Sequence, residues 1–492
     1  MGQVRKQAAR YTIVNFLATA VAALATVTIY AQERELYGLI GFLMDTAVLF
    51  SPFILLSTPI SIQRYFPYYA QNENGQRSVF SLGLVIIAVG VLLMIPILFL
   101  FKGVIIPQLP EYAQGEQAEN FFFYIFPIAI AYAIINYLFA YSSIFKDVAL
   151  PSFFAVANKF FAPFIILIYS LGWLDVKASV YLLILFYFLT AVWFLFFSYR
   201  RNRLHWANPI KAFDKINPRD FFSFGLFSLL TVFGKQMTLR IDSFMVPLLF
   251  TVGMNGEYRI AAFMAGVLLV PFRSIAALMS PMIANAWKKE DLRDIEKMYH
   301  DSSIHSLLVG TFIFLLIYYN IDALLEVMPR GEELVYLKQV FIVIALARLV
   351  DLGSGVNDQI ISFSKYYRFN FYLLFILGVS NVVLNLLFAD WYGFIGIAMA
   401  TALSLAFFNA AKMAFIFFRY RLQPFSWSTV RLVVLNALVV MSMEFFPDMV
   451  NPWLRGALTG LWITLLFISL AFVFKISRSW NALLLERIKR LF

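Results

Sequence analysis

The sequence contains no cysteine and only three histidines among its 492 residues. The absence of cysteine excludes disulfides, thiol catalysis and thiolate metal sites. Charged residues are also scarce, at 14% of the chain, whereas hydrophobic residues make up 62%. Water-soluble domains carry about 25% charged residues. The composition therefore predicts a membrane protein, and no metal site is expected.

Soluble domains and catalytic motifs are missing too. No polar connection is long enough to fold as a soluble domain, so a membrane enzyme of glycan assembly would have no loop to hold its chemistry. The phosphate-binding sequence GxxxxGK[ST], zinc-ligand spacings and catalytic-triad signatures do not occur. We therefore expect a protein that is not an enzyme, uses no cofactor and works inside its helical bundle.

The chain does contain fourteen apolar stretches, each close to the roughly 20 residues that a membrane helix needs. None shows the alternation of membrane β-strands. The expected spans are 11–31, 36–62, 79–101, 121–144, 151–172, 178–199, 221–250, 257–284, 303–321, 335–363, 369–389, 393–417, 429–446 and 454–474. The predicted fold class is an all-α polytopic membrane protein with about 14 transmembrane helices.

The connections between these stretches alternate in charge. One set is basic, including both chain ends and the segment 200–219, while the intervening set is acidic or nearly uncharged. By the positive-inside rule the basic set and both termini face the cytoplasm. The formal charge of +11 is thus spread over many cytoplasmic segments rather than one stripe. This distribution is not that of a nucleic-acid-binding surface, so no nucleic-acid partner is expected.

The segment 200–219, RRNRLHWANPIKAFDKINPR, reads as a linker because it combines dense basic charge with two Asn-Pro breaks. A faint repeat spans it: Tyr37 to Arg64 and Tyr258 to Asn285 are equally spaced, and both stretches run from outside to inside. We predict two six-helix lobes in a parallel repeat plus a two-helix extension. The predicted boundaries are 1–200 for the N-terminal lobe, 201–220 for the cytoplasmic linker, 221–420 for the C-terminal lobe, and 421–492 for two extra helices with an amphipathic basic tail.

Prolines interrupt two spans in corresponding positions. The second span contains Pro52 and Pro59, and the eighth contains Pro271 and Pro281. Paired interrupted helices indicate a transport site, although prolines also simply set packing angles in membrane helices.

Ionisable residues inside the spans are the candidate functional residues. They are Asp45, Lys159, Lys235, Arg240, Asp242, Arg273, Arg348, Asp351 and Asp358. Each would cost about 2.5–3.5 kcal/mol facing lipid at the bilayer centre, so they must face a hydrated cavity or one another.

Helical spacing suggests which of these charges pair. Arg348 and Asp351 are three residues apart, with Asp358 two turns further along the same face, and Lys235 and Asp242 are seven apart. These pairs either bind a ligand or serve only as structural ion pairs. Arg273 has no acid at helical spacing, which makes it the best single candidate for a ligand contact. Lys412 is expected to extend toward the membrane surface.

Several stretches carry a resemblance to a known family. They are GQVRKQAARYTIVNFLATAV, ERELYGLIGF with SIQRYFPYY, and a Tyr-Arg before a span with Asn381 and Asn385 inside it, followed by Gly-x2-Gly-x-Ala-x-Ala-Thr. This pattern resembles the polysaccharide flippases (Wzx-like O-antigen and exopolysaccharide translocases) of the multidrug/oligosaccharidyl-lipid/polysaccharide superfamily.

The resemblance implies two lobes that open to one side of the bacterial inner membrane at a time. Its cargo would be an oligosaccharide on a polyprenyl pyrophosphate, moved from the inner to the outer leaflet for lipopolysaccharide or exopolysaccharide synthesis. Membrane lipids, a polysaccharide polymerase and glycosyltransferases would be partners. The alternatives are a multidrug or small-molecule exporter and a lipid II flippase. The resemblance also implies that lipid II flippases line their cavity with arginines of the first span. The first span here, 11–31, has no charge, which argues against lipid II.

Site roles follow from this interpretation. We expect the cavity cations to contact pyrophosphate or acidic sugars: Arg273, Arg240, Arg348, Lys159 and Lys235. The acids Asp351, Asp358, Asp242 and Asp45 would orient those cations or carry a coupling proton or sodium ion. The membrane potential is a further possible driving force.

Overall fold

The computed structural model describes residues 19–69, 72–105, 116–144, 149–200, 206–447 and 449–476. In this part of the chain all regular structure is helical, and eight helices are long and apolar enough to cross a membrane. Two bent pairs raise that number to ten if each is one span. The predicted class, an all-α polytopic membrane protein, is confirmed.

The first compact unit, unit 1, comprises Met1–Arg259. Its described helices are η1 (Thr26–Tyr30), α2 (Arg34–Leu55), α3 (Thr58–Tyr65), η2 (Phe66–Tyr69), α4 (Glu73–Ile105), α5 (Glu116–Ile144), α6 (Ala149–Ser170), α7 (Val176–Arg200), η5 (Pro209–Phe213), α8 (Pro218–Leu249) and the start of α9 (Val252–Val267).

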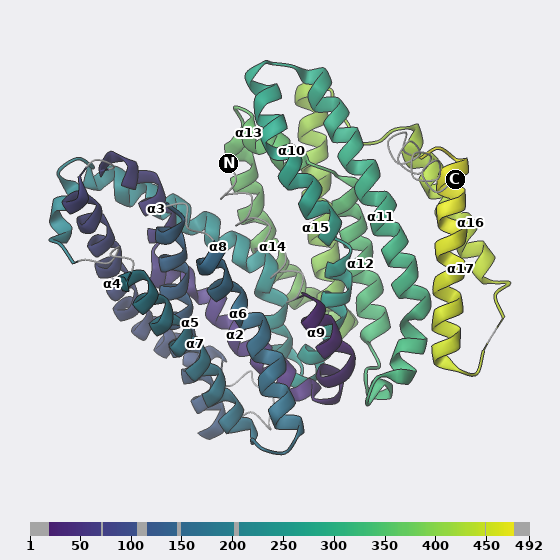
Figure 1. The fold of residues 1–492 in the computed structure, drawn as a ribbon, viewed down its shortest axis with the longest axis horizontal. Helices are drawn as coiled ribbons and strands as arrows, with labels where there is room; N and C mark the ends of the chain where they lie inside the picture. Colours follow the sequence, from purple (N-terminus) through teal and green to yellow (C-terminus); the bar gives the residue numbers. More distant parts are fainter. Residues whose placement is uncertain are drawn as a thin grey trace. The chain divides into compact units, whose positions relative to one another are not determined.

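The second unit, unit 2, comprises Ile260–Phe492. Besides the end of α9, its described helices are α10 (Val270–Lys288), α11 (Leu292–Val327), η6 (Gly331–Glu333), α12 (Leu337–Gly353), α13 (Asn357–Phe363), α14 (Tyr367–Tyr392), α15 (Phe394–Tyr420), α16 (Trp427–Met443) and α17 (Pro452–Val473) (Figure 1).

The expected count of fourteen spans stays a prediction. Four expected spans are not among the eight helices or the two bent pairs. They correspond to α8, which carries Lys235, Arg240 and Asp242, and to shorter apolar helices at Thr19–Tyr30, Phe160–Ser170 and Trp427–Met443. The lobe boundaries predicted from the sequence also stay a prediction. In the structure α8 packs against α2 and α3, and it belongs to unit 1.

Helix α2 forms the centre of unit 1. It packs against α4, α5 and α8, and most of its residues are buried. A helix that is apolar on nearly every side can be surrounded by lipid or by other helices, and α2 is surrounded by helices. This burial explains how α2 can place an ionisable residue, Asp45, deep among other helices.

Three of the four prolines predicted to interrupt helices lie beside breaks, whereas Pro281 lies inside α10. Helix α2 ends at Leu55, and Leu56 and Ser57 both adopt left-handed backbone angles (φ 44° and 60°) before α3 begins. Pro52 lies in the last turn of α2 and Pro59 in the first turn of α3. In the eighth span, α9 and α10 meet at a 50° bend, with Pro271 in the first turn of α10.

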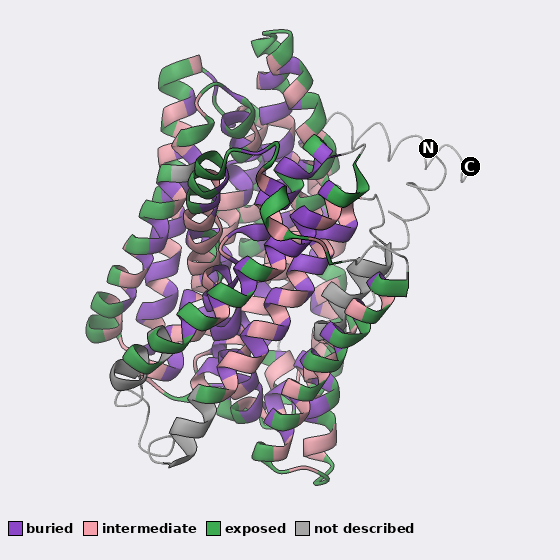
Figure 2. Ribbon diagram, turned by 90° about the vertical axis from the view of Figure 1, so that its left-hand side faces the viewer, coloured by how far each residue is buried: buried purple, intermediate pink, exposed green. Residues whose placement is uncertain are grey.

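In unit 2, α15 packs against α12 and α14, and α11 packs against α10, α12 and α17. The C-terminal pair α16–α17 is joined to the rest of unit 2 by an apolar cluster that includes Leu308, Leu435 and Ile463. Figure 2 shows how buried and exposed residues alternate around the helices, as expected where one face packs and the other faces outward.

Two predicted spans need correction. The ninth span was expected at 303–321, but α11 begins at Leu292, because Asp291 caps its start and its polar first turns need no apolar surroundings. The tenth span was expected at 335–363, and the structure divides this stretch into α12 and α13 with a 49° bend between them. Gly355, with φ +53°, lies at this break.

Candidate functional site

Three charged residues of unit 1 form what we call the arginine cluster: Asp45 on α2, Arg240 on α8 and Arg259 on α9. Asp45 Oδ1 accepts a hydrogen bond from Arg240 Nη1, and Asp45 Oδ2 accepts one from Arg259 Nη1. The Asp45 side chain is 3% exposed, Arg259 is 18% exposed and Arg240 is 40% exposed. The carboxylate is therefore enclosed, and a guanidinium faces outward.

Two glycines of α2 allow this arrangement. A Cβ at Gly41 would overlap the Arg259 side chain, so the missing side chain makes room for the guanidinium. A Cβ at Gly38 would overlap the Val252 carbonyl at the start of α9. At Gly38 only glycine permits the two backbones to approach so closely, whereas at Gly41 the missing side chain leaves room for the Arg259 side chain. The spacing of Gly38 and Gly41 thus brings the start of α9 onto α2, one turn before Asp45.

Aromatic rings complete the cluster. The Arg259 guanidinium lies 5.2 Å from the centre of the Tyr37 ring. Tyr37 in turn stacks on Tyr30, with 3.9 Å between ring centres. A cation over an aromatic face is stabilised by about 0.5–2 kcal/mol, more when it is desolvated. These rings hold Arg259 in place without adding negative charge.

The arginine cluster has a surplus of positive charge, because one carboxylate faces two guanidinium groups. The Nε atoms of Arg240 and Arg259 are buried and have no hydrogen-bond partner among the described residues. Guanidinium groups bind phosphate and carboxylate oxygens through paired N–H donors. The half-exposed Arg240 is thus suited to an anionic ligand.

Unit 2 holds a second polar group, which we call the hinge cluster: Asp351, Asp358, Asn409 and Lys412, around the break between α12 and α13. The break leaves backbone groups without helical partners, and α11 supplies substitutes. Val356 N donates to Ser302 Oγ at 3.2 Å, and Ser303 Oγ donates to the Gly353 carbonyl at 2.7 Å. Broken membrane helices persist only where such groups are satisfied.

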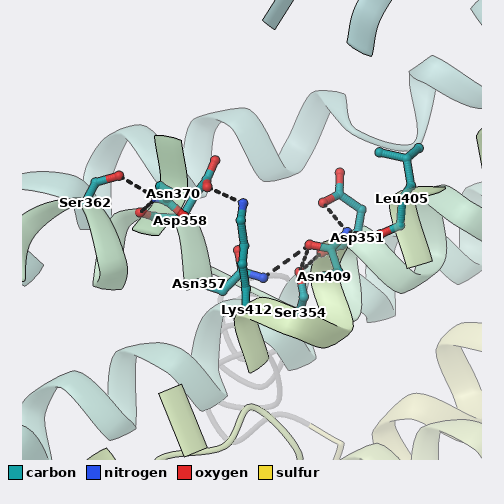
Figure 3. A network of polar contacts seen from close by, with 9 residues as sticks. All are labelled: Asp351, Ser354, Asn357, Asp358, Ser362, Asn370, Leu405, Asn409 and Lys412. Atoms are coloured by element: carbon teal, nitrogen blue, oxygen red, sulfur yellow. Dashed lines mark hydrogen bonds and ion pairs between the residues drawn. The ribbon is translucent and has the colours of Figure 1, made fainter. Parts of the chain in front are cut away.

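Side chains of α15 span the hinge (Figure 3). Asn409 Nδ2 donates to Asp351 Oδ1 at 3.2 Å, on the α12 side of the break. Asn409 Oδ1 accepts from Asn357 Nδ2 at 3.2 Å, on the α13 side. Lys412, one turn further along α15, forms an ion pair with Asp358 on α13. The hinge is therefore held by hydrogen bonds to both of its helices.

The Lys412–Asp358 pair has the reverse exposure of the arginine cluster. The Lys412 side chain is 2% exposed and that of Asp358 is 61% exposed. Lys412 Nζ also lies 3.7 Å from the centre of the Phe408 ring. The outward-facing carboxylate is therefore the accessible member of the pair, and the ammonium is the enclosed one. Among the described residues no group of three or more His, Asp or Glu side chains could hold a metal ion.

The structure brings two predicted site residues together, Asp45 and Arg240. It adds Arg259, which the sequence analysis did not select because this residue lies near the outer end of the eighth span. The signal that could have found it is the glycine pair on α2, which indicates a close neighbour.

Neither pairing predicted along a single helix forms a direct ion pair among the described residues. Lys235 is exposed and makes no ion pair among the described residues, while Asp242 accepts a hydrogen bond from the Tyr258 hydroxyl at 2.6 Å. A separation of seven residues is about 10 Å along a helix, too far for a direct contact. Arg348 and Asp351 likewise form no ion pair in the described part of unit 2, where Asn409 of α15 binds Asp351 instead.

Other predicted residues have varied surroundings. Arg348 is half-buried, and its buried Nε has no hydrogen-bond partner among the described residues. Arg273 is exposed on α10 and has no ion pair there either. The side chain of Lys159 lies outside the described part of the structure. Lys412 does not extend to the membrane surface as expected, because Asp358 and Phe408 hold it inside unit 2.

Comparisons with known proteins bear on the fold. No family model matches the chain. A protein of Haloferax volcanii described as the probable low-salt glycan biosynthesis flippase Agl15 is 20% identical over 280 residues, which are 53% of this chain and 54% of that protein. The matched region is thus about half the length of this curated relative.

Solved structures match over most of the chain. The lipid II flippase MurJ, in an inward closed conformation, superposes with a TM-score of 0.76 at 12% identity and covers 94% of this chain and 98% of that structure. An inward-facing multidrug resistance transporter of the MATE family has a TM-score of 0.61 at 14% identity and covers 82% of this chain and 94% of that structure. The chain therefore has the fold shared by a lipid II flippase and a multidrug transporter of the MOP superfamily.

Proposed function

We propose that this protein is a flippase of the MOP superfamily that moves an oligosaccharide linked to a polyprenyl pyrophosphate from the inner to the outer leaflet. The observation that carries the proposal is the surplus positive charge of the arginine cluster, where Arg240 and Arg259 share one buried carboxylate. Anionic cargo is attracted to such a site, and a cationic drug is repelled. The fold likeness to a flippase and the Agl15 match support the same class.

The cargo would bind through its pyrophosphate. The geometry supports Arg240 most strongly as a contact for the pyrophosphate, since its guanidinium is half-exposed and already oriented by Asp45. Arg273, Arg348, Lys235 and Lys159 remain predicted contacts for the pyrophosphate or for acidic sugars. An inside-negative membrane potential favours outward movement of an anion by about 2.3 kcal/mol per charge per 100 mV.

Coupling to an ion belongs to the hinge cluster in this proposal. Protonation of the exposed Asp358, or a cation bound to it, would weaken the ion pair with Lys412 and loosen the hinge between α12 and α13. The hydrogen bond from Asn409 to Asp351 would remain, so α15 would stay attached to α12 while α13 is released. The proposal also places the protein in the bacterial inner membrane with both termini in the cytoplasm. There it would associate with a polymerase and glycosyltransferases.

Lipid II is the second candidate cargo, because the flippase that superposes at a TM-score of 0.76 is named for it. The match to a protein described as a glycan biosynthesis flippase favours the oligosaccharide. The described part of the first span, from Thr19 to Ala31, contains no charged residue, so it offers no contact to the pyrophosphate of either cargo.

Transport by the purified protein in proteoliposomes tests the proposal. Three cargoes are compared: a polyprenyl-pyrophosphate-linked oligosaccharide, lipid II and a cationic dye. We expect movement of the first, slower or no movement of the second and none of the third. Arg455→Gln is a suitable control for substitutions of Arg240, because Arg455 is a cation that pairs with Glu326 at the surface of unit 2. Movement of the dye alone would overturn the proposal.

A further inference from the structure

A pocket of about 490 Å³ lies in unit 1. Its walls come from α3, from η2, from the segment 215–217 and from the first turns of α8, and it shares no residue with the arginine cluster. Its volume falls within the range of about 300–1,000 Å³ that is usual for small-molecule sites. The pocket is thus large enough to enclose a lipid headgroup.

Two cations line this pocket, Arg64 and Lys215, and aromatic rings rather than carboxylates hold them. The Arg64 guanidinium lies 4.0 Å from the centre of the Phe224 ring. Lys215 Nζ lies 5.7 Å from the centre of the Tyr69 ring. Neither forms an ion pair with any described residue. Because ring contacts leave the N–H donors unused, both cations can bind an anion.

The segment that carries Lys215 is fixed in place. The Tyr69 hydroxyl donates to the Ala212 carbonyl at 2.8 Å and accepts from Lys215 N at 2.9 Å. Tyr69 itself is 2% exposed. A buried tyrosine therefore anchors the stretch before α8, so binding of a ligand would require little ordering of the chain.

The start of α8 adds to the positive potential. Asn217 caps this helix by accepting from Arg219 N, and its first residues lie at the pocket wall. A helix N-terminus carries about half a positive charge. Asp220 also lines the pocket. Two cations against one carboxylate still leave the pocket net positive.

The pocket also has an apolar side. Phe224 and Phe227 line it, and Phe227 is 62% exposed. Leu226 and Phe222 on the same turns of α8 are 60% and 54% exposed. A soluble anion would leave this apolar surface uncovered, whereas the hydrocarbon chain of a lipid phosphate can cover it.

We propose that this pocket binds the phosphate group of a membrane lipid at the predicted cytoplasmic face. Arg64 and Lys215 would contact the phosphate oxygens, and the lipid chain would lie over Phe227. The site is separate from the one proposed for transport, and its occupation would secure the start of α8 against α3.

Native mass spectrometry of the full-length protein in detergent, with phosphatidylglycerol titrated in, tests this inference. We expect Arg64→Gln combined with Lys215→Gln to weaken retention of the lipid roughly tenfold or more, because charge-assisted hydrogen bonds to phosphate are lost. Lys211→Gln is the matched control, since Lys211 is an exposed cation of the same segment that does not line the pocket. Retention equal to wild type in the double variant would overturn the inference.

A second variant guards against misfolding. Ser223→Asp keeps both cations and adds a negative charge at an exposed pocket position. It should weaken retention of phosphatidylglycerol in a protein that elutes as wild type in size-exclusion chromatography, and unchanged retention would contradict the site.

Further probes distinguish sources of the phosphate. Pocket-dependent retention of phosphatidylglycerol indicates a bilayer lipid, and retention of a polyprenyl pyrophosphate instead indicates a cargo lipid. Both support a lipid phosphate site, whereas binding of inorganic phosphate alone would overturn it. Pocket-dependent binding of phosphatidylglycerol by a protein that moves no oligosaccharide would leave this inference intact and remove only the proposed function.

Discussion

The arginine cluster of unit 1 and the hinge cluster of unit 2 have the same arrangement with opposite signs of charge. Each combines a buried charge with a partner that reaches outward. In unit 1 the buried member is the carboxylate of Asp45, and Arg240 faces outward. In unit 2 the buried member is the ammonium of Lys412, and Asp358 faces outward. Unit 1 therefore exposes the positive member of its cluster, and unit 2 exposes the negative member.

The two clusters also differ in redundancy. Asp45 has two cationic partners, so the loss of one still leaves an ion pair. Lys412 has a single ion-pair partner among the described residues, Asp358. Breaking a buried ion pair leaves an uncompensated charge, which is far more costly than replacing the pair by apolar groups. The comparison thus predicts different responses to single substitutions.

The largest expected effect follows from Asp45→Asn, which removes the carboxylate shared by both arginines. Loss of one member of a buried pair costs about 3–5 kcal/mol in free energy of unfolding. Denaturant titration in detergent micelles measures this change. Asp390→Asn is a suitable control, because Asp390 is exposed at the end of α14. Equal stability of the two variants would mean that Arg240 and Arg259 do not depend on Asp45.

The next largest effect concerns the hinge pair. Asp358→Asn should cost about 3 kcal/mol, because it leaves Lys412 buried without a counter-charge. Lys412→Met should change the free energy of unfolding by less than about 1 kcal/mol, since the remaining carboxylate is exposed and stays hydrated. The same titration compares both variants. A larger loss for Lys412→Met would show that the exposures of the pair are reversed.

A smaller effect is expected from alanine substitutions at two glycines with positive φ. Comparing them distinguishes the cost of backbone strain from the cost of a packing clash. Gly172 in unit 1 has no atom near its Cβ position, while a Cβ at Gly355 in unit 2 would lie 2.7 Å from Ser302 Oγ. Gly172→Ala should cost about 1 kcal/mol for the left-handed backbone alone. Gly355→Ala should cost about 2 kcal/mol or more, because the hinge must also shift away from α11. Equal shifts in thermal unfolding temperature would show that the break is not tightly packed.

Much of the fold was predictable because a membrane helix needs a long apolar stretch, and the chain provides them. The polar extension of α11 was missed because its first turns resemble a soluble connection. The break at Gly355 was missed because a single glycine in an apolar run is compatible with a continuous helix. Its identification requires the serines of α11, which are distant in sequence.

The candidate site was predictable by residue type but not by partner. Spacing along one helix suggested pairs within α8 and within α12. The observed ion pairs instead join residues 195 and 54 positions apart, Asp45 with Arg240 and Asp358 with Lys412. Helix packing decides which charges meet, and spacing within one helix carries no information about it.

The measurement that tests the central claim most directly is transport of a polyprenyl-pyrophosphate-linked oligosaccharide by Arg240→Gln and Arg240→Lys in proteoliposomes. Both variants keep the Asp45–Arg259 pair, so their free energy of unfolding should change by less than about 1 kcal/mol. Arg240→Gln should reduce the transport rate about tenfold or more, because a charge-assisted contact to the anion is lost. Arg240→Lys should retain more of the rate than Arg240→Gln, because it keeps the positive charge but loses the paired N–H donors. Transport at the wild-type rate by Arg240→Gln would contradict the proposal that unit 1 presents its positive charge to the cargo.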